Sequence, residues 1–249
     1  MTTELAECGW RNEVITQPDG TVTNTKVPLT DSEFLHPQEG YRLPNSTFHD
    51  TVAGDVKDIL MRRYASSSDT GIFRDLLIEW DIPDLNDHCP DTFVVFGIRN
   101  QEQNRSKFIV ANEGVRPALI IEVVSPRYRK EDRETKVVQY ARASVQEYVI
   151  IDQRTYRGQV LDEVVGYRLV EGHYQPITPD DQGRILCETI GLWISLQNGR
   201  LVMEDAQTEL QLKTSLELAA ENSELAAENS ELAALLARYR ESFGDLPGR

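Results

Sequence analysis

The chain has 249 residues, 40% of them hydrophobic, and a formal net charge of −15 at neutral pH. This length gives one large domain or two modest ones, with enough apolar residues for a buried core. The acidic balance argues against nucleic-acid binding that depends on a broad surplus of Lys and Arg. No apolar run is long enough to cross a membrane and the first residues are polar, so we expect a soluble, cytoplasmic protein.

The three cysteines, Cys8, Cys89 and Cys187, lie far apart in the sequence and form no CxxC pair. An odd number at such spacing argues against a disulfide framework and against a zinc cluster. We therefore expect reduced thiols.

Three segments are expected along the chain: an N-terminal arm at 1–29, a domain at 30–204 and a tail at 205–249. The arm is polar and Thr-rich, so we expect a loose segment or an edge element. Thr30 and Glu33 then have the spacing of a capping box, which predicts a short helix at the start of the domain.

A longer helix is predicted between Ser46 and about Tyr64. Ser46 and Thr47 suit an N-cap. Apolar residues recur on one side at spacings of three and four: Phe48, Val52, Val56, Ile59 and Leu60. His49 and Asp50 fall in the first turn, where they either face a functional site or offset the helix dipole.

The predicted sheet begins with an apolar strand at Phe73–Trp80 and continues with a central strand in TFVVFGI, directly after Asp91. A polar excursion at Arg99–Val115 leads to a third strand at Ala118–Val124, which contains Glu122. We expect this strand to return beside the central one, which would bring Asp91 and Glu122 together.

Glu122 is the residue that most needs an explanation. Its neighbours are Ile120, Ile121, Val123 and Val124, so the sequence places a carboxylate in a strand that is apolar on both faces. A buried ionised carboxylate costs several kcal/mol unless it is paired or bound to a metal. Glu122 is therefore half-exposed, neutral or a ligand, and we favour a ligand.

A charged helix at about 129–143 follows this strand and leads to another strand, Glu147–Asp152. A strand, helix and strand of this length predict a right-handed parallel crossover. Asp132, Lys136 and Tyr140 recur every four residues along the helix, so they share one face.

Four basic residues around the start of this helix are candidates for contact with a phosphate backbone: Arg127, Arg129, Lys130 and Arg133. Three acids are interspersed with them: Glu131, Asp132 and Glu134. A charged, solvated helix face is therefore an equally good interpretation.

Beyond residue 158 we predict short antiparallel strands added at the edge of the sheet. Glu171-Gly172 and Asn198-Gly199 stand between apolar runs, and Asn-Gly is a strong hairpin signal. His173 beside the first turn is expected to lie on the surface.

The tail contains heptads, LELAAENSELAAENSELAALLARYRE, that place Leu218, Leu225 and Leu232 at d positions and Asn222 and Asn229 at a positions. Buried Asn pairs favour a parallel dimer at a cost in stability, and Glu at g faces Ala at e, which avoids acidic repulsion. Such a short zipper is near the length limit for independent helices, so we expect a homodimer assisted by contacts elsewhere. The alternative is a solvated single helix or a disordered acidic tail.

Asp91, Glu122 and Lys136 form the chemically informative set. Two carboxylates from adjacent strands suit Mg²⁺ or Mn²⁺, which combine a few carboxylates with water and substrate phosphate. Such an ion would polarise a phosphodiester and lower the pKa of a bound water, while the lysine would orient that water or stabilise charge. Tyr140 could hold the lysine or a phosphate, and Asp132 could pair with Lys136. Taken alone, Asp91 also fits a turn cap and Lys136 a solvated helix face.

At these residues the sequence resembles the PD-(D/E)XK nuclease superfamily, and more closely its Uma-two type branch. The matching positions are Pro90-Asp91, EVVS at Glu122–Ser125, Asp132, Lys136, Tyr140 and SVQEYVIID at Ser144–Asp152. The resemblance spans roughly residues 30–194 and implies an α/β (α+β) fold, a restriction-endonuclease-like mixed sheet flanked by helices, with the coiled-coil helix outside it. It also implies metal-dependent cleavage of DNA, with Asp91 and Glu122 binding Mg²⁺ or Mn²⁺ and Lys136 assisting the attacking water.

One position departs from the superfamily pattern. The usual lysine two residues after the second acid is Val124 here, so the resemblance implies that Lys136 reaches the same site from the following helix. We therefore expect a Mg²⁺-dependent endodeoxyribonuclease that acts on DNA as a homodimer. The acidic charge and Val124 favour an alternative, a catalytically inactive nuclease-fold binding or scaffold protein. A hydrolase of small phosphate esters is less favoured, because no Gly-rich phosphate loop occurs.

Overall fold

The computed structural model describes residues 9–17, 20–30, 33, 40–41, 46–125, 129–157 and 159–244. Its centre is a mixed sheet of six strands in the order β10, β9, β8, β7, β5, β3. The strands have these bounds: β3 (Thr70–Phe73), β5 (Thr92–Phe96), β7 (Leu119–Val123), β8 (Glu147–Tyr156), β9 (Gln159–Val170) and β10 (His173–Pro176). Neighbours run antiparallel except β7 and β8, which run parallel, so the predicted parallel crossover is confirmed.

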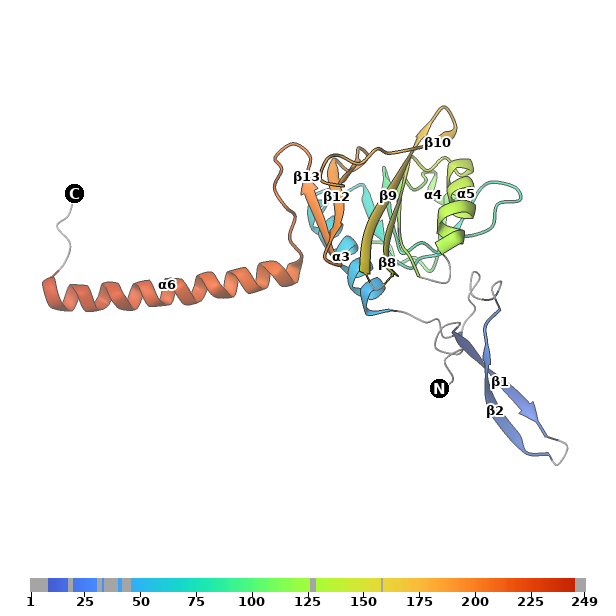
Figure 1. Ribbon diagram of the computed structural model, residues 1–249, viewed down its shortest axis with the longest axis horizontal. Coiled ribbons are helices and arrows are strands. Elements are labelled where there is room, and N and C mark those ends of the chain that lie inside the picture. The colour runs from blue at the N-terminus through green and yellow to red at the C-terminus, as the bar shows by residue number, and fades with distance from the viewer. Residues whose placement is uncertain are drawn as a thin grey trace.

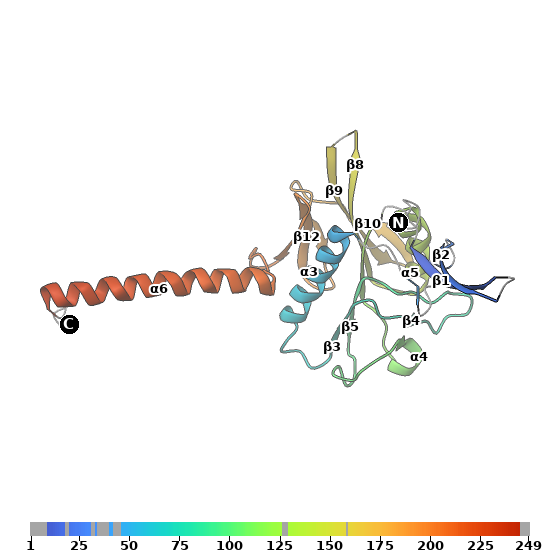
Figure 2. The ribbon, with the colours of Figure 1, turned by 90° about the horizontal axis from the view of Figure 1, so that it is seen from below.

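Helices cover both faces of this sheet, as Figure 2 shows. On one face lies α3 (Thr47–Arg63), which begins where predicted, because the Ser46 hydroxyl accepts the backbone N–H of His49 at 3.0 Å. On the other face the chain forms a π-helical turn, η1 (Glu131–Thr135), followed by α5 (Lys136–Arg142). The predicted α+β fold, a mixed sheet flanked by helices, is confirmed.

The alternation of side chains along β7 divides the interior into two cores. Leu119 and Ile121 belong to the core between the sheet and α3. Ile120 and Val124 belong to the core beneath α5. Glu122 is on the same side of the strand as Ile120 and Val124, so the strand geometry directs this carboxylate toward α5.

Three further strands form a separate antiparallel sheet: β11 (Ile185–Cys187), β12 (Leu192–Gln197) and β13 (Arg200–Asp205). The prediction that the strands after residue 158 extend the main sheet is therefore right for β9 and β10 and wrong for these three. Their apolar side chains, including Ile194 and Met203, are buried in the α3 core, which requires a position over the sheet rather than at its edge.

Both predicted hairpin turns are present. Glu171 and Gly172 connect β9 to β10, and Asn198 and Gly199 connect β12 to β13. All four residues have positive φ angles, between 50° and 81°, as a type I′ turn requires. His173, next to the first turn, is exposed as expected.

The strand predicted at Phe73–Trp80 is wrong. β3 ends at Phe73, and Ile78–Glu79 forms a separate short strand, β4, which pairs with β6 (Phe108–Ile109) outside the main sheet. The break lies at Asp75, whose φ of 51° is in the left-handed region and interrupts the extended backbone.

The polar segments outside the main sheet contain small elements. The excursion at Arg99–Val115 includes β6 and a short helix, α4 (Val110–Glu113). The N-terminal arm contains an antiparallel hairpin of β1 (Trp10–Thr16) and β2 (Val22–Pro28), which extends away from the domain in Figure 1.

Two predictions, the capping box of Thr30 with Glu33 and the short helix after it, concern residues at the border of the described part of the chain. Thr30 and Glu33 make the reciprocal bonds of a capping box, at 2.9 and 3.2 Å, which confirms that pattern. Most of the short helix predicted after Thr30 lies outside the described residues. Cys89 and Cys187 are free thiols, and Cys8 lies outside the described residues.

The tail forms one long helix, α6 (Ser215–Phe243), which projects from the domain in Figures 1 and 2. Thr214 begins it with a capping box that includes Glu217. None of the residues of α6 is buried, and Leu225 and Leu232 are at least half exposed. No helix in the described part of the chain is both long and apolar enough to span a membrane.

The root of α6 is attached to α3. The backbone N–H and the hydroxyl of Ser215 both donate to the Asp58 carboxylate, and Arg62 donates to the carbonyl of Lys213 at 2.6 Å. These contacts fix the direction in which α6 leaves the domain.

A buried carboxylate, Glu147 at the start of β8, joins the two sheets. It accepts hydrogen bonds from the Arg168 guanidinium at 2.9 Å and from the backbone N–H groups of Glu188 and Thr189 at 3.0 and 2.8 Å. Arg168 also pairs with the Glu188 side chain at 2.8 Å, but that carboxylate is 60% exposed. The same arginine therefore has one buried and one exposed partner.

Replacing Glu147 by Ala should lower the free energy of unfolding by about 3 kcal/mol, because two backbone N–H groups and Arg168 lose their acceptor. Glu188→Ala removes the exposed partner of Arg168 and should cost less than about 1 kcal/mol. Urea unfolding followed by circular dichroism measures both changes. Equal losses in the two variants would contradict the role of Glu147 as the link between the sheets.

Candidate active site

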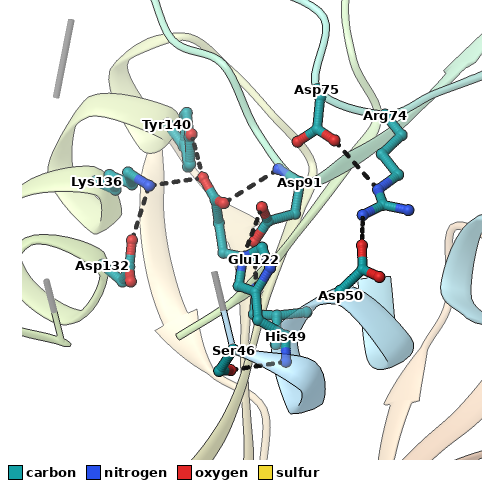
Figure 3. Close-up of polar contacts among 11 residues, drawn as sticks. Ser46, His49, Asp50, Arg74, Asp75, Asp91, Glu122, Asp132, Lys136 and Tyr140 are labelled. Atoms are coloured by element: carbon teal, nitrogen blue, oxygen red, sulfur yellow. Dashed lines mark hydrogen bonds and ion pairs between the residues drawn. The ribbon is translucent and has the colours of Figure 1, made fainter. Parts of the chain in front are cut away.

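The candidate active site lies where β5 and β7 meet the N-terminal end of α3, as Figure 3 shows. The two strands are adjacent and antiparallel, so Asp91, just before β5, lies beside Glu122 on β7. The backbone N–H of Asp91 donates to Glu122 Oε2 at 3.2 Å, and Asp91 Oδ2 accepts the backbone N–H of Val123 at 2.7 Å. The structure thus brings together the two carboxylates that the sequence singled out.

Glu122 is buried, with 3% of its surface exposed. Its Oε1 atom accepts hydrogen bonds from Lys136 Nζ at 2.8 Å and from Tyr140 Oη at 2.9 Å. A half-exposed carboxylate is therefore excluded, and the polar partners that burial requires come from α5 on one side and from the Asp91 backbone on the other.

Lys136 lies between two acids. Its ammonium is 2.8 Å from Glu122 and 2.7 Å from Asp132 Oδ1, four residues earlier in the helix. Burial alone would lower the pKa of Lys136, but the two neighbouring carboxylates outweigh it and the pKa is raised. Lys136 therefore places a fixed positive charge in the site at neutral pH.

Burial raises the pKa of Glu122 to about 7, and the nearby charges of Asp91 and Asp132 act in the same direction while Lys136 opposes them. Burial likewise raises the pKa of Asp132, against the effect of Lys136. Glu122 and Asp132 therefore share one ammonium group, close to the negative charge of Asp91. An added cation at this position would relieve their mutual repulsion.

His49 holds Asp91 from the first turn of α3. Its Nε2 atom is 3.0 Å from Asp91 Oδ1. Burial would raise the pKa of Asp91, but the hydrogen bond and charge of His49 and the Val123 N–H outweigh it, so that pKa is lowered. Burial would lower the pKa of His49, and Asp91 reverses this effect, so that pKa is raised. The pair therefore favours an ionised Asp91.

A second set of charges lies next to this pair, and two of its members, Arg74 and Asp75, were missed by the sequence analysis. Arg74 reaches Asp50 at 3.0 Å and Asp75 at 3.2 Å, as Figure 3 shows. Burial and the charge of Asp91 raise the pKa of Asp75. The signal that could have revealed this set is the Arg-Asp pair inside an otherwise apolar run, which marks a break in the strand rather than its continuation.

His88 was also missed, although it precedes Pro90-Asp91 by two residues in the sequence. It is buried, accepts the indole N–H of Trp80 at 2.8 Å and lies 2.7 Å from Gln139 Oε1. Its ring packs on that of Tyr140 with a centroid distance of 4.9 Å. His88 thus supports the tyrosine that donates to Glu122.

Two of the basic candidates are held by acids of the sheet. Arg129 makes two bonds to Asp152, at 2.7 and 2.9 Å, and Arg133 bridges Asp152 and Glu163. The Asp152 side chain is fully buried. These arginines therefore anchor the start of the helix to β8 and β9, and their guanidinium groups are already paired.

The other two basic candidates differ from them. Lys130 is 83% exposed, with Glu134 3.8 Å away. Arg127 lies outside the described residues.

The free acceptor positions of the site are carboxylate oxygens, the donor type that hard divalent cations prefer. An ionised carboxylate offers about four lone-pair positions, and Glu122 uses three of them in hydrogen bonds whereas Asp91 accepts from Val123 and His49. Among the described residues, no group of three or more His, Cys, Asp or Glu side chains is arranged to hold a metal ion. Carboxylate oxygens are the donor type that Mg²⁺ uses in proteins, together with several waters and substrate phosphate.

Residues 41–197 match the family model Uma2, described as "Putative restriction endonuclease". This stretch is more than half of the chain and contains both carboxylates, Lys136 and His49. The chain belongs to the Uma2 family. Its Uma2 region excludes the β1–β2 hairpin and α6.

A solved structure, titled a "putative nuclease belonging to DUF820" from Anabaena variabilis ATCC 29413, is similar to this Uma2 chain. The two are 14% identical, the alignment covers 74% of this chain and 96% of that one, and the TM-score is 0.45. No curated protein matches the chain at a significant level.

The pKa of Glu122 predicts how the stability of this Uma2 protein depends on pH. Between the usual value near 4.5 and about 7, the folded protein keeps a proton on Glu122 that the unfolded chain releases. Folding takes up a proton in this window, so this group makes the free energy of unfolding fall as the pH rises through it. Glu122→Gln stays neutral at every pH and lacks this contribution.

Urea unfolding in the presence of chelator, repeated from about pH 4.5 to about pH 7.5, measures the effect as the difference between the two proteins. The wild type should lose stability relative to Glu122→Gln as the pH rises. A difference that stays constant across the window would show that the folded and unfolded states bind the same number of protons at Glu122.

Proposed function

We propose that this Uma2 protein is an endonuclease that hydrolyses phosphodiester bonds in DNA with Mg²⁺ or Mn²⁺ as cofactor. The observation that carries the proposal is the position of Lys136, which points into the site and contacts Glu122 beside Asp91. Val124 occupies the position at which the superfamily pattern usually has its lysine. Lys136 provides an ammonium group at the same carboxylate from the following helix. Membership of a family described as restriction endonucleases supports the reaction class.

In this proposal Asp91 and Glu122 hold the cation. When bound, the ion would polarise the phosphodiester and lower the pKa of a water molecule. His49 keeps Asp91 ionised and oriented, and the backbone N–H of Val123 fixes the second oxygen of the same carboxylate. These contacts prearrange one ligand before any cation enters.

Lys136 acts on the reacting atoms in this proposal. Its ammonium is held by Asp132 and Glu122, so little reorganisation is needed when negative charge develops on the phosphate. The lysine would orient the attacking water or stabilise that charge. Tyr140, which shares Glu122 Oε1 with Lys136, limits the rotation of the carboxylate.

Plasmid nicking tests the reaction and its residues. The wild type should nick DNA with Mg²⁺ or Mn²⁺ and lose this activity with chelator, and Asp91→Asn and Glu122→Gln should each reduce the rate by at least about 100-fold. Lys136→Met should cause a similar loss while Mn²⁺ binding, followed by calorimetry, is retained. Glu188→Gln, an exposed carboxylate outside the site, serves as the control and should keep the wild-type rate.

Cleavage that persists in both carboxylate variants would contradict the assignment of the active site to Asp91 and Glu122. A wild type that binds no Mn²⁺ and cleaves no DNA would instead support a nuclease-fold scaffold protein. Circular dichroism of each variant separates lost chemistry from lost folding.

We propose in addition that α6 pairs in parallel with α6 of a second copy of this chain. Two of its d positions, Leu225 and Leu232, form an apolar stripe that the domain does not cover, whereas the d position at the root, Leu218, is partly buried. Asn222 and Asn229 at a positions favour two parallel strands in one register. Contacts of the root of α6 with α3 keep the stripe away from the domain, where a second copy can reach it.

Sedimentation equilibrium tests the pairing. The wild type should behave as a dimer of 28.3 kDa chains, and the double variant Leu225→Glu with Leu232→Glu should be a monomer, because it places four like charges at the seam of a pair. The matched control is Ala220→Glu with Ala227→Glu, which adds the same charge at outward f positions and should leave the dimer intact. A wild-type monomer at micromolar concentration would contradict the proposal.

A further inference from the structure

The helix that carries Lys136 contains a π-turn directly before Lys136, preceded by the α-helical residues Arg129 and Lys130. In η1, Glu131–Thr135, the backbone N–H of Lys136 donates to the carbonyl of Glu131, five residues earlier. Turns of this kind are rare and are concentrated at functional sites. Because the turn contains Asp132 and leads directly into Lys136, its geometry determines where Lys136 meets Asp132 and Glu122.

A buried phenol contacts this turn from below. Tyr148 Oη donates to the main-chain carbonyl of Asp132 at 3.0 Å, and the Tyr148 side chain is fully buried. Tyr148 lies on β8 opposite Ile120 of β7. Ile120 is on the same side of β7 as Glu122, so the phenol and the carboxylate rise from the same face of the sheet.

We propose that Tyr148 is a positioning residue of the nuclease site, which holds the π-turn so that Lys136 lies between Asp132 and Glu122. This inference rests on the proposed function. Tyr148 acts through the backbone of Asp132, and its hydroxyl is 3.0 Å from that carbonyl rather than directed at the carboxylates. Loss of the hydroxyl removes this contact and lets the turn open more often, which would move Lys136 relative to Glu122.

The ring of Tyr148 is held independently of its hydroxyl. It packs against Tyr140 at a centroid distance of 4.9 Å and stacks on Tyr167 and Tyr174 at 6.3 and 6.4 Å. Tyr148→Phe therefore removes one O–H group while the aromatic stack remains. This makes it a narrow probe of the contact with Asp132.

Tyr174 provides a matched control in the same stack. Its hydroxyl also donates to a main-chain carbonyl at 3.0 Å, that of Val145 beyond the far end of α5. Tyr174→Phe removes the same kind of bond from the same cluster, but at a distance from the π-turn. A purely structural role of the phenols predicts similar behaviour of the two variants.

Amide hydrogen exchange followed by mass spectrometry tests the contact without reference to activity. In Tyr148→Phe, exchange in peptides that cover residues 129–140 should be faster by about 10-fold or more, because the turn opens more often. In Tyr174→Phe, exchange in these peptides should match the wild type. Unchanged exchange in Tyr148→Phe would overturn the proposal whatever the enzyme does.

The nicking assay then tests the catalytic consequence. Tyr148→Phe should lower kcat by about 10-fold to 100-fold while KM for DNA stays within about 2-fold, since a displaced Lys136 impairs the reaction more than binding. Tyr174→Phe should keep the wild-type kcat. Equal loss of kcat in both variants would overturn the positioning role. An inactive wild type would refute the proposed function, and the exchange data would still decide whether Tyr148 holds the turn.

Discussion

The contact between Glu122 and Lys136 joins the central sheet to the helix that covers it. Glu122 is buried on β7, so its charge requires partners, and it finds them in Lys136, Tyr140 and the backbone N–H of Asp91. A buried ion pair of this kind adds little stability compared with well-packed apolar residues, whereas breaking it is costly. Its presence is better explained by the chemistry of a site than by the stability of the fold.

Much of the site was predictable because it depends on regular periods. Glu122 stood out as a carboxylate in an apolar strand, and the four-residue spacing of Asp132, Lys136 and Tyr140 placed them on one helix face. Side chains that reach the site from other parts of the fold follow no such periodic spacing in the sequence. The left-handed backbone at Asp75 and the pairing of two arginines with β8 depend on tertiary contacts, which a charge pattern cannot show. The same holds for β11–β13, whose apolar residues fit an edge strand and a second layer equally well.

Helix α3 contacts the candidate active site at its N-terminal end and the root of α6 toward its C-terminal end. His49 in its first turn contacts Asp91, while Asp58 and Arg62 toward its other end hold the root of α6. His49 and Arg62 are separated by about 20 Å, from the rise of 1.5 Å per residue in an α-helix. A pairing of two α6 helices would therefore bring two domains together while the sites remain at the opposite ends of their α3 helices.

The net charge of −15 is distributed unevenly along the chain. The segment from Glu204 to Arg249 has ten acids and four bases and so contributes −6 to that total. Exposed charges more than about 10 Å away are largely screened at physiological ionic strength. Within the domain, buried acids such as Glu147 and Asp152 are neutralised by arginines. Under the proposed function, a phosphate at the site would therefore experience the charges around Lys136 more strongly than the charge of the tail.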